Sequence, residues 1–335
     1  LVYVLITSSR TGGEALEAAR AFAAAGHTPL IWSPDGIAPQ GWLSDPSPDG
    51  ETLIRSAVAR AAGGESPSGL MLLPLERGWT VADGLAVLET AARNPGAMVA
   101  ARRAGGLPAL ERVAAWIYRF TQGRTVHDLY AGLAVWPARL VGALNRPGRN
   151  PLYTRALLSV RSLNLPLAEV ELRPQEPPAV RPAAAVVWNM LCFLAVFLRF
   201  TCSSLLSAGV DYGLFALLLT PLHYAEAAHA VARAVSSTVN FTLNRMLVFS
   251  DRQSRVPLAQ ALVRYFALAV VVAAVGTGLI RLFSTVLGLP AMPVKLAVDI
   301  LLYVISFLVQ RELVFHRRRP RRVPRTAKST EPEVR

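Results

Sequence analysis

The sequence predicts an α/β domain followed by an all-α transmembrane domain of four helices, arranged as two two-helix repeats. In the first half, short apolar strands alternate with helical segments, which is typical of a parallel sheet covered by helices. The second half contains apolar segments long enough to cross a bilayer. In that half, the stretch Asn-Arg-Met-Leu-Val-Phe at 244–249 is echoed by Gln-Arg-Glu-Leu-Val-Phe at 310–315.

The composition supports a chain divided between water and membrane. Hydrophobic residues make up 53% and charged residues 17%, which is too apolar for an ordinary soluble domain and too charged for a chain wholly inside a bilayer. Residues 1–180 carry 17 Arg and 15 Asp or Glu, whereas residues 181–335 carry 18 Lys or Arg and 7 Asp or Glu. The net charge of +13 therefore lies mostly in the membrane half, and it indicates contact with anionic lipids rather than with nucleic acid.

The elements of the first half follow from apolar periodicity and from glycine and proline positions. We expect strands at 2–7, 28–32, 70–73 and 97–101, and helices at 14–25, 51–62 and 81–94. Ligands of such sheets bind at the carboxyl ends of the strands. This rule places a candidate site near Asp35 and Glu76.

Changes in composition set the expected boundaries. The α/β domain covers 1–172, and a proline-rich linker covers 173–182. Arg199 divides the long apolar run that follows into a helix at the membrane interface, 183–198, and a first span. The transmembrane domain then covers 199–315, and a basic tail without apolar periodicity, 316–335, should be disordered.

The distribution of basic residues predicts the orientation of the spans. Spans are expected at 200–219, 225–249, 263–287 and 292–315, and a fifth crossing within 183–198 is left open. Arginines gather between the second and third spans and in the tail, whereas the loops on the other side carry no Lys or Arg. The positive-inside rule therefore predicts cytoplasmic N and C termini, and the apolar opening strand gives no sign of a signal peptide.

Ionisable residues inside the expected spans include Asp211 in the first, Arg233 in the second, and Lys295 and Asp299 in the fourth. Charges at this depth are costly and need partners or water. Arg233, Ser236, Asn240 and Asn244 recur at steps of three or four residues and form a polar stripe, which should face the interior of the bundle. The charges mark either a path for a phosphate-bearing lipid or structural pairs that fix helix register.

The first half resembles the family 2 glycosyltransferases of the GT-A fold, a Rossmann-like α/β fold, and in particular the polyprenyl- or dolichyl-phosphate sugar synthases. Pro-Asp-Gly-Ile at 34–37 stands where that family has Asp-Asp-Gly-Ser, and Pro-Leu-Glu at 74–76 stands where it has Asp-x-Asp. Asp-Leu-Tyr-Ala-Gly-Leu at 128–133 keeps the family's Asp-x-x-x-Gly-Leu pattern near the acceptor. The resemblance implies nucleotide binding by Asp35, metal binding by Glu76 and a catalytic role for Asp128.

The departures from this pattern predict a degenerate transferase domain. Mg²⁺ and Mn²⁺, which bridge a sugar-nucleotide diphosphate, need carboxylate oxygens, and Pro74 supplies none. A divalent metal and a UDP- or GDP-sugar are therefore expected only if the domain is active, and otherwise no cofactor is expected. The plain alternatives are a turn aspartate for Asp35 and a solvated loop acid for Glu76.

The second half resembles the GtrA-like membrane domains more closely. The resemblance rests on Arg199-Phe200, on Asn240-Phe241-x-x-Asn244-Arg245 and on Gln310-Arg311 near the end of the fourth span. It implies a lipid-phosphate or translocation site made of Asp211, Arg233, Asn240, Asn244, Arg245, Lys295, Asp299, Gln310 and Arg311.

Together these observations predict a multi-pass protein of a bacterial-type inner or plasma membrane, in cell-envelope polysaccharide or glycolipid biosynthesis. It would act as a flippase for polyprenyl-phosphate-linked sugars, or present them, with an impaired transferase domain. The alternatives are an active polyprenyl-phosphate glycosyltransferase and an accessory scaffold for a separate transferase. Expected partners are the glycolipid and anionic membrane lipids, and a homo-oligomer remains open because one copy supplies only four spans.

Overall fold

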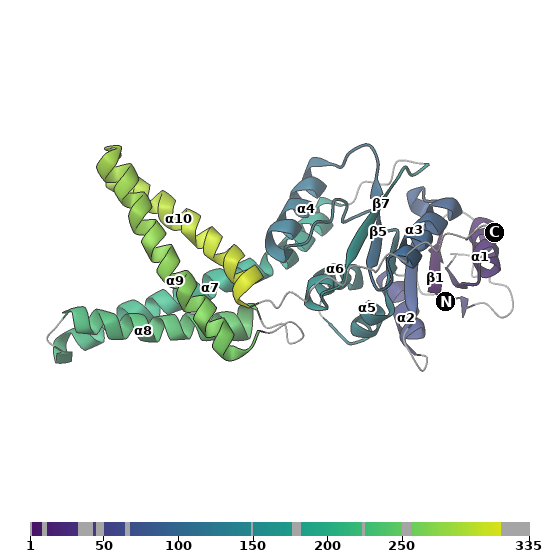
Figure 1. Ribbon diagram of the computed structural model, residues 1–335. Coiled ribbons are helices and arrows are strands. Elements are labelled where there is room, and N and C mark those ends of the chain that lie inside the picture. The colour runs from purple at the N-terminus through teal and green to yellow at the C-terminus, as the bar shows by residue number, and fades with distance from the viewer. Residues whose placement is uncertain are drawn as a thin grey trace, which may run out of the picture.

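The computed structural model describes residues 2–8, 12–32, 43–44, 50–63, 68–148, 150–175, 182–222, 225–249 and 256–315. Within them, the chain forms an α/β domain and a separate group of long helices (Figure 1). The predicted division into an α/β and an all-α part is confirmed. Most of the expected linker, at 176–181, and the whole basic tail lie outside the described residues.

The α/β domain is built on one seven-stranded sheet with the strand order β3-β2-β1-β4-β6-β5-β7. Strand β6 runs antiparallel to both of its neighbours, and the other pairs are parallel. The expectation of a parallel sheet is corrected at this one strand, whose three residues are too few to show a periodic pattern. The strands are β1 Val2–Thr7, β2 Thr28–Trp32, β3 Leu43–Ser44, β4 Gly69–Pro74, β5 Met98–Arg103, β6 Ala134–Trp136 and β7 Leu167–Leu172.

Helices cover both faces of this sheet, because successive side chains of a buried strand point to opposite sides. Val4 and Ile6 of β1 pack in the core on the side of α1 and α3, whereas Leu5 packs on the side of α2, α4, α5 and α6. The helices are α1 Gly12–Ala24, α2 Gly50–Ala62, α3 Val81–Arg93, α4 Ala109–Gln122, α5 Ala138–Leu144 and α6 Leu152–Ser162.

The helical part begins with α7, Ala183–Leu222, a continuous helix of 40 residues. The helix break expected at Arg199 is wrong, since no proline or glycine interrupts the chain there and an arginine is compatible with a helix. At 1.5 Å per residue α7 is about 60 Å long, twice the roughly 30 Å of a bilayer's hydrocarbon core. About half of α7 must therefore lie outside the hydrocarbon, and an interfacial position for 183–198 stays a prediction.

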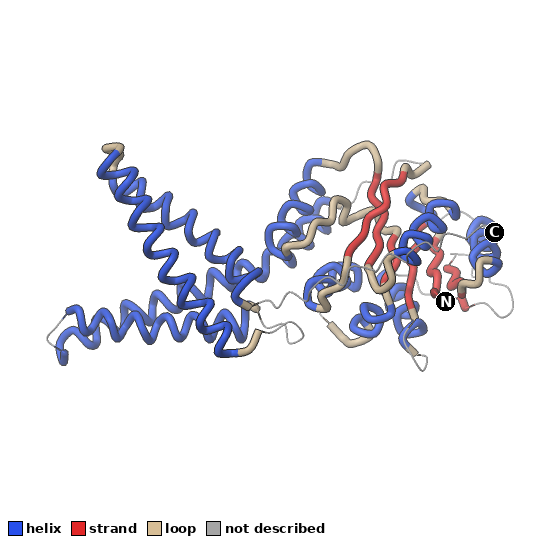
Figure 2. The backbone as a smooth tube through the Cα atoms, viewed as in Figure 1, coloured by secondary structure: helices blue, strands red, loops and turns tan. Residues whose placement is uncertain are grey.

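Three more long helices follow, and together with α7 they form two hairpins that diverge from a common base (Figure 2). They are α8 Ala225–Leu243, α9 Leu258–Ile280 and α10 Ala291–Val309. Each continues into a π-helical turn, η2 Asn244–Val248, η3 Arg281–Val286 and η4 Gln310–Val314. Among the described residues, Ala183–Leu218 and Leu258–Ser284 are long and apolar enough to cross a membrane, with mean hydropathies of 2.0 and 2.2. The four-span topology stays a prediction.

Aromatic side chains join the two parts of the chain. Helix α4 packs along α7, with Tyr118 meeting Phe193 edge to face at 5.0 Å between ring centroids. Phe120 contacts both Phe197 of α7, at 5.5 Å, and Phe307 of α10, at 5.6 Å. The carboxyl end of α4 therefore rests on the base of the two hairpins.

Candidate functional site

A cavity of about 340 Å³ opens at the carboxyl edge of the sheet, where β1 ends at Thr7 and β4 ends at Pro74. Its floor is the apolar sheet, its rim carries Glu76 and Arg77, and α7 closes one side with Trp188. Its lining includes Thr7, Glu51, Glu76, Tyr153, Trp188 and Asn189. This edge is where the order of elements predicted a ligand site.

Glu76, the predicted metal ligand, lies on the rim of this cavity. The Thr7 hydroxyl donates to its carboxylate, at 3.0 Å from Oε1 and 2.8 Å from Oε2. Partial burial raises the pKa of Glu76, and the backbone and Thr7 hydrogen bonds and the charge of Arg77 oppose this shift. The sequence did not identify Thr7 as a partner, because 69 residues separate the two.

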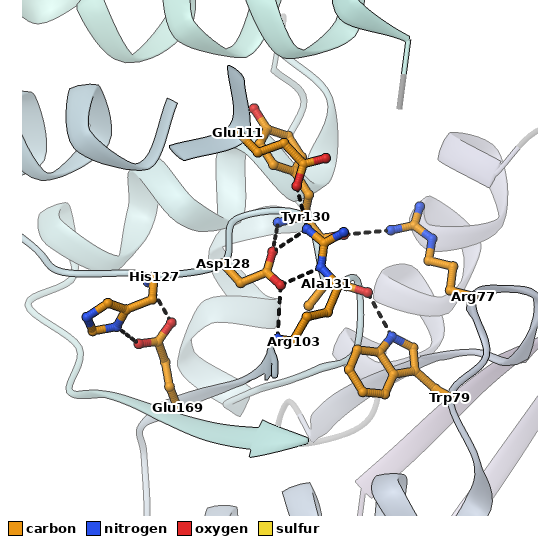
Figure 3. Close-up of polar contacts among 9 residues, drawn as sticks. All are labelled: Arg77, Trp79, Arg103, Glu111, His127, Asp128, Tyr130, Ala131 and Glu169. Atoms are coloured by element: carbon orange, nitrogen blue, oxygen red, sulfur yellow. Dashed lines mark hydrogen bonds and ion pairs between the residues drawn. The ribbon is translucent and has the colours of Figure 1, made fainter. Parts of the chain in front are cut away.

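The two segments that resemble transferase motifs lie against each other (Figure 3). The Arg77 guanidinium donates to the carbonyl of Tyr130 at 3.1 Å, and the Trp79 indole donates to the carbonyl of Ala131 at 2.9 Å. Gly132 follows with a φ of +84°, and a Cβ there would lie 2.6 Å from Arg77 Nη1. The backbone angle therefore favours glycine at this position, and a Cβ would also displace the Arg77 guanidinium.

Asp128, the predicted catalytic residue, is fully buried. Its carboxylate accepts hydrogen bonds from the Arg103 side chain, with Nε at 2.6 Å and Nη2 at 2.9 Å, and from the backbone N–H groups of Arg103 and Tyr130. Arg103 also pairs with Glu111. Burial lowers the pKa of Arg103, but these two acids raise it further than burial lowers it. This geometry favours a structural role for Asp128 over the predicted catalytic one.

The carboxylates that line the cavity do not make a divalent cation site. Glu51 accepts from the backbone N–H of Leu152 at 3.0 Å with each of its oxygens, so it caps the start of α6. Among the described residues there is no group of three His, Cys, Asp or Glu side chains placed to hold a metal. Glu76 alone offers fewer oxygens than Mg²⁺ or Mn²⁺ needs. Asp35, the predicted nucleotide ligand, lies outside the described residues.

In the helical part, three predicted polar residues meet between α7 and α8. Arg233 Nη1 lies 3.5 Å from Asp211 Oδ2, and Ser236 donates to Asp211 Oδ1 at 2.9 Å. The Asp211 side chain is 13% exposed, whereas that of Arg233 is 63% exposed. Asp299 is exposed on α10, one turn after Lys295, whose side chain lies outside the described part of the chain.

Asn244 is the centre of a buried amide network. It accepts from the Ser203 hydroxyl, and its Nδ2 donates to Asn240 Oδ1 at 3.2 Å and to Gln310 Oε1 at 3.1 Å. Asn240 in turn donates to the Tyr265 hydroxyl at 3.0 Å. The network links all four long helices, so much of the predicted polar stripe does face inward, while Arg233 at its far end is exposed.

The two arginines that follow the echoed amides have different partners. Arg245 donates to the carbonyl of Val256 at 3.0 Å, within the helical part. Arg311 is almost fully buried and donates to the carbonyl of Phe120, at the end of α4.

Beside Arg311, Arg161 of α6 donates to the Arg311 carbonyl at 2.8 Å and pairs with Glu312 at 3.0 Å. This contact between the two parts was not predicted, since nothing in the sequence around Arg161 distinguishes it from a surface arginine.

Comparisons with known proteins agree with this division. Residues 199–315 match the family described as GtrA/DPMS, transmembrane domain. No curated protein matches the chain. The chain is therefore a membrane-associated protein with an α/β domain at its N-terminal end. Its C-terminal part is a GtrA/DPMS transmembrane domain, which confirms the resemblance stated for that half.

Among solved structures, the chain is similar to glucosyl-3-phosphoglycerate synthase from Mycobacterium tuberculosis in complex with Mn²⁺, UDP and phosphoglyceric acid. The identity is 11% and the TM-score 0.41, over 57% of this chain and 78% of the synthase. It is also similar to residues 1–349 of TarS from S. aureus, with 9% identity and a TM-score of 0.34 over 92% of this chain and 91% of that one.

Proposed function

We propose that this protein binds polyprenyl-phosphate-linked sugars at the cytoplasmic face of the membrane and presents or translocates them for cell-envelope polysaccharide or glycolipid assembly. The observation that carries the proposal is the shared wall of the cavity. Ala185, Trp188 and Asn189 of α7 line the same cavity as Thr7 and Glu76 at the sheet edge. A headgroup held there would lie beside the helix that leads into the bilayer.

The surroundings of the cavity suit a sugar headgroup. Tyr153 and the exposed Trp188 offer flat apolar surfaces, bordered by hydroxyl and amide groups that form hydrogen bonds. Thr154 donates to Asn189 Oδ1 at 2.8 Å and fixes the position of that amide. The site therefore combines a few oriented polar groups with an apolar lining, as small-molecule sites do.

In this proposal the α/β domain binds a headgroup without efficient sugar transfer. A nucleotide-sugar diphosphate needs its charge neutralised by a divalent cation, and Pro74 occupies the position of one acid that would hold the cation. Glu76 is then a polar rim residue. The cations Arg233 and Lys295, which lie inside the expected spans, would interact with the lipid phosphate as the headgroup moves through the four-span domain.

Binding and translocation measurements test this function. The full chain in lipid nanodiscs should bind a polyprenyl-phosphate sugar, and Trp188→Ala should weaken that binding at least about tenfold if one aromatic contact of about 1.4 kcal/mol is lost. In reconstituted vesicles, Arg233→Ala should abolish glycolipid translocation, while Arg281→Ala, on the other hairpin, should leave it unchanged. No binding to the glycolipid, together with tight binding of UDP or GDP with Mn²⁺, would refute the proposal.

The second candidate function is an active polyprenyl-phosphate glycosyltransferase. The raised pKa of Glu76 at the rim of the cavity favours it, because perturbed carboxyl groups in clefts often serve as acids or bases. Transfer of labelled sugar from UDP- or GDP-sugar to polyprenyl phosphate separates the two candidates. Metal-dependent transfer that is lost in Glu76→Gln would establish the enzyme.

A further inference from the structure

The two hairpins of the membrane domain touch through equivalent residues of the two repeats. Asn244 and Gln310, which are 66 residues apart, share a hydrogen bond of 3.1 Å. Phe249 and Phe315, at the same interval, stack with centroids 5.1 Å apart and an interplanar angle of 18°. Residues related by a twofold rotation meet only near its axis, so an approximate twofold axis passes through these two contacts.

The aromatic packing around the axis repeats in the same way. Phe241 of α8 contacts Phe315 at 5.7 Å and 37°, and its equivalent in the second repeat, Phe307 of α10, contacts Phe249 at 6.2 Å and 32°. If each residue is replaced by its equivalent in the other repeat, the first contact becomes the second. The base of the hairpins is therefore a symmetric joint, formed by residues that the repeated sequence places in equivalent positions.

In this joint, Asn244 and Gln310 begin π-helical turns, η2 on one hairpin and η4 on the other. Single π-helical turns within helices are rare and often coincide with functional sites. Above the joint the two hairpins diverge as separate arms (Figure 2). Turns packed at the base of two diverging arms are suited to act as a hinge.

Opposite charges occupy equivalent positions on the two arms. Arg233 precedes Asn244 by the same interval as Asp299 precedes Gln310. This interval makes about three helical turns, so each charge lies on the same helix face as the amide at the joint and about 16 Å along the helix from it. Both residues are exposed, and Arg233 lies 3.5 Å from Asp211, longer than the roughly 2.7–2.9 Å of a well-formed charged hydrogen bond.

From these observations we propose that the membrane domain has a second, closed arrangement, in which the arms swing together about η2 and η4 and Arg233 pairs with Asp299. An exposed arginine at membrane depth is unfavourable, and an acid at the same depth on the facing arm relieves that cost. The closed pair would release Arg233 from Asp211. This inference goes beyond the proposed function, and its test needs no glycolipid.

The test measures the separation of the arm tips by pulsed electron resonance of spin labels. Labels are placed at Leu217→Cys and Leu289→Cys, which are exposed positions near the tips, in full-length protein with Cys192→Ser and Cys202→Ser. In lipid nanodiscs we expect two distance populations, and the shorter one should be lost in Arg233→Gln and in Asp299→Asn.

Three controls keep the outcome decisive. Asp299→Glu keeps the charge and should retain the short population, and Arg281→Gln removes a charge elsewhere on the second hairpin and should also retain it. Each variant is first shown to elute as one species in gel filtration. A single distance population in the wild type, or a short population that survives both Arg233→Gln and Asp299→Asn, would overturn the proposal.

Discussion

Replacing Asp128 by asparagine tests whether this acid holds the candidate site together. The substituted amide keeps the shape of the side chain but presents N–H donors to the guanidinium of Arg103, which is also a donor. Breaking a buried ion pair by removing one partner costs about 3–5 kcal/mol. The lower end of this range of free energies applies here, because Arg103 keeps its ion pair with a second acid, Glu111. We therefore expect Asp128→Asn to destabilise the α/β domain by about 3 kcal/mol.

Thermal unfolding of the full chain, followed by tryptophan fluorescence, measures this loss. A domain of this size loses roughly 2–4 °C per kcal/mol, so the expected decrease in Tm is roughly 6–12 °C. Glu89→Gln is the matched control, since its ion pair with Arg93 is exposed and is worth about 1 kcal/mol at most. A Tm for Asp128→Asn equal to that of the control would refute the structural role and return Asp128 to the predicted catalytic one.

Three further substitutions test other parts of the structure. Because the pKa of Glu76 is raised in the folded protein, its stabilising effect is complete below the unfolded pKa and is lost as pH rises through the folded value. Glu76→Gln should therefore increase Tm above that range, and an unchanged pH profile of Tm would contradict this. Gly123 has a φ of +66°, and a Cβ there would collide with the Glu312 carboxylate, so Gly123→Ala should cost more in an unfolding measurement than the about 1–2 kcal/mol of the backbone angle. Gly26→Ala, with φ +80° and open space around it, should cost only that backbone part. Asn244→Leu leaves Gln310 without its donor and should cost about 1–2 kcal/mol in detergent denaturation, and no loss would show that the amide network is dispensable.

The sequence predicted those elements of the α/β domain whose pattern is local. Strand β1 and strand β4 are continuous apolar runs bounded by turn residues, so their positions could be derived directly. Strand β6 could not, because its three residues adopt an extended conformation only through pairing with β4 and β5. Its antiparallel direction likewise depends on contacts with strands that are distant from it in the sequence.

The residues of the candidate site were predicted more completely than their partners. Glu76 was identified by its place after a strand and Asp128 by the resemblance of 128–133 to a transferase motif, but the groups that determine their roles, Thr7 and Arg103, lie 69 and 25 residues away. A side chain's charge is visible in the sequence, whereas its burial is a property of the fold. For this reason the sequence could suggest chemistry for Asp128 and could not reveal that its carboxylate is enclosed.

In the membrane domain the echoed stretches gave correct helix ends, since α8 with η2 and α10 with η4 end where the repeat predicted. The contact of Asn244 with Gln310 could not be derived, because a repeat defines equivalent positions and leaves their distance open. Arg199 was misread for a simple reason. A charged residue marks where a helix meets water, and it carries no backbone signal that ends the helix.

The contact of Arg311 with α4 affects how the chain is assembled during synthesis. The carbonyl of Phe120, at the end of α4, is made early, but the guanidinium that binds it arrives 191 residues later with the last helix. At the known pace of translation, roughly 5–20 residues per second, this end of α4 waits on the order of ten seconds or more for its partner. The α/β domain can fold first, but its connection to the membrane domain closes only when the last hairpin is in place. A ribosome-stalled chain lacking η4 would therefore carry a folded α/β domain whose α4 is not yet fixed to the membrane domain by this contact.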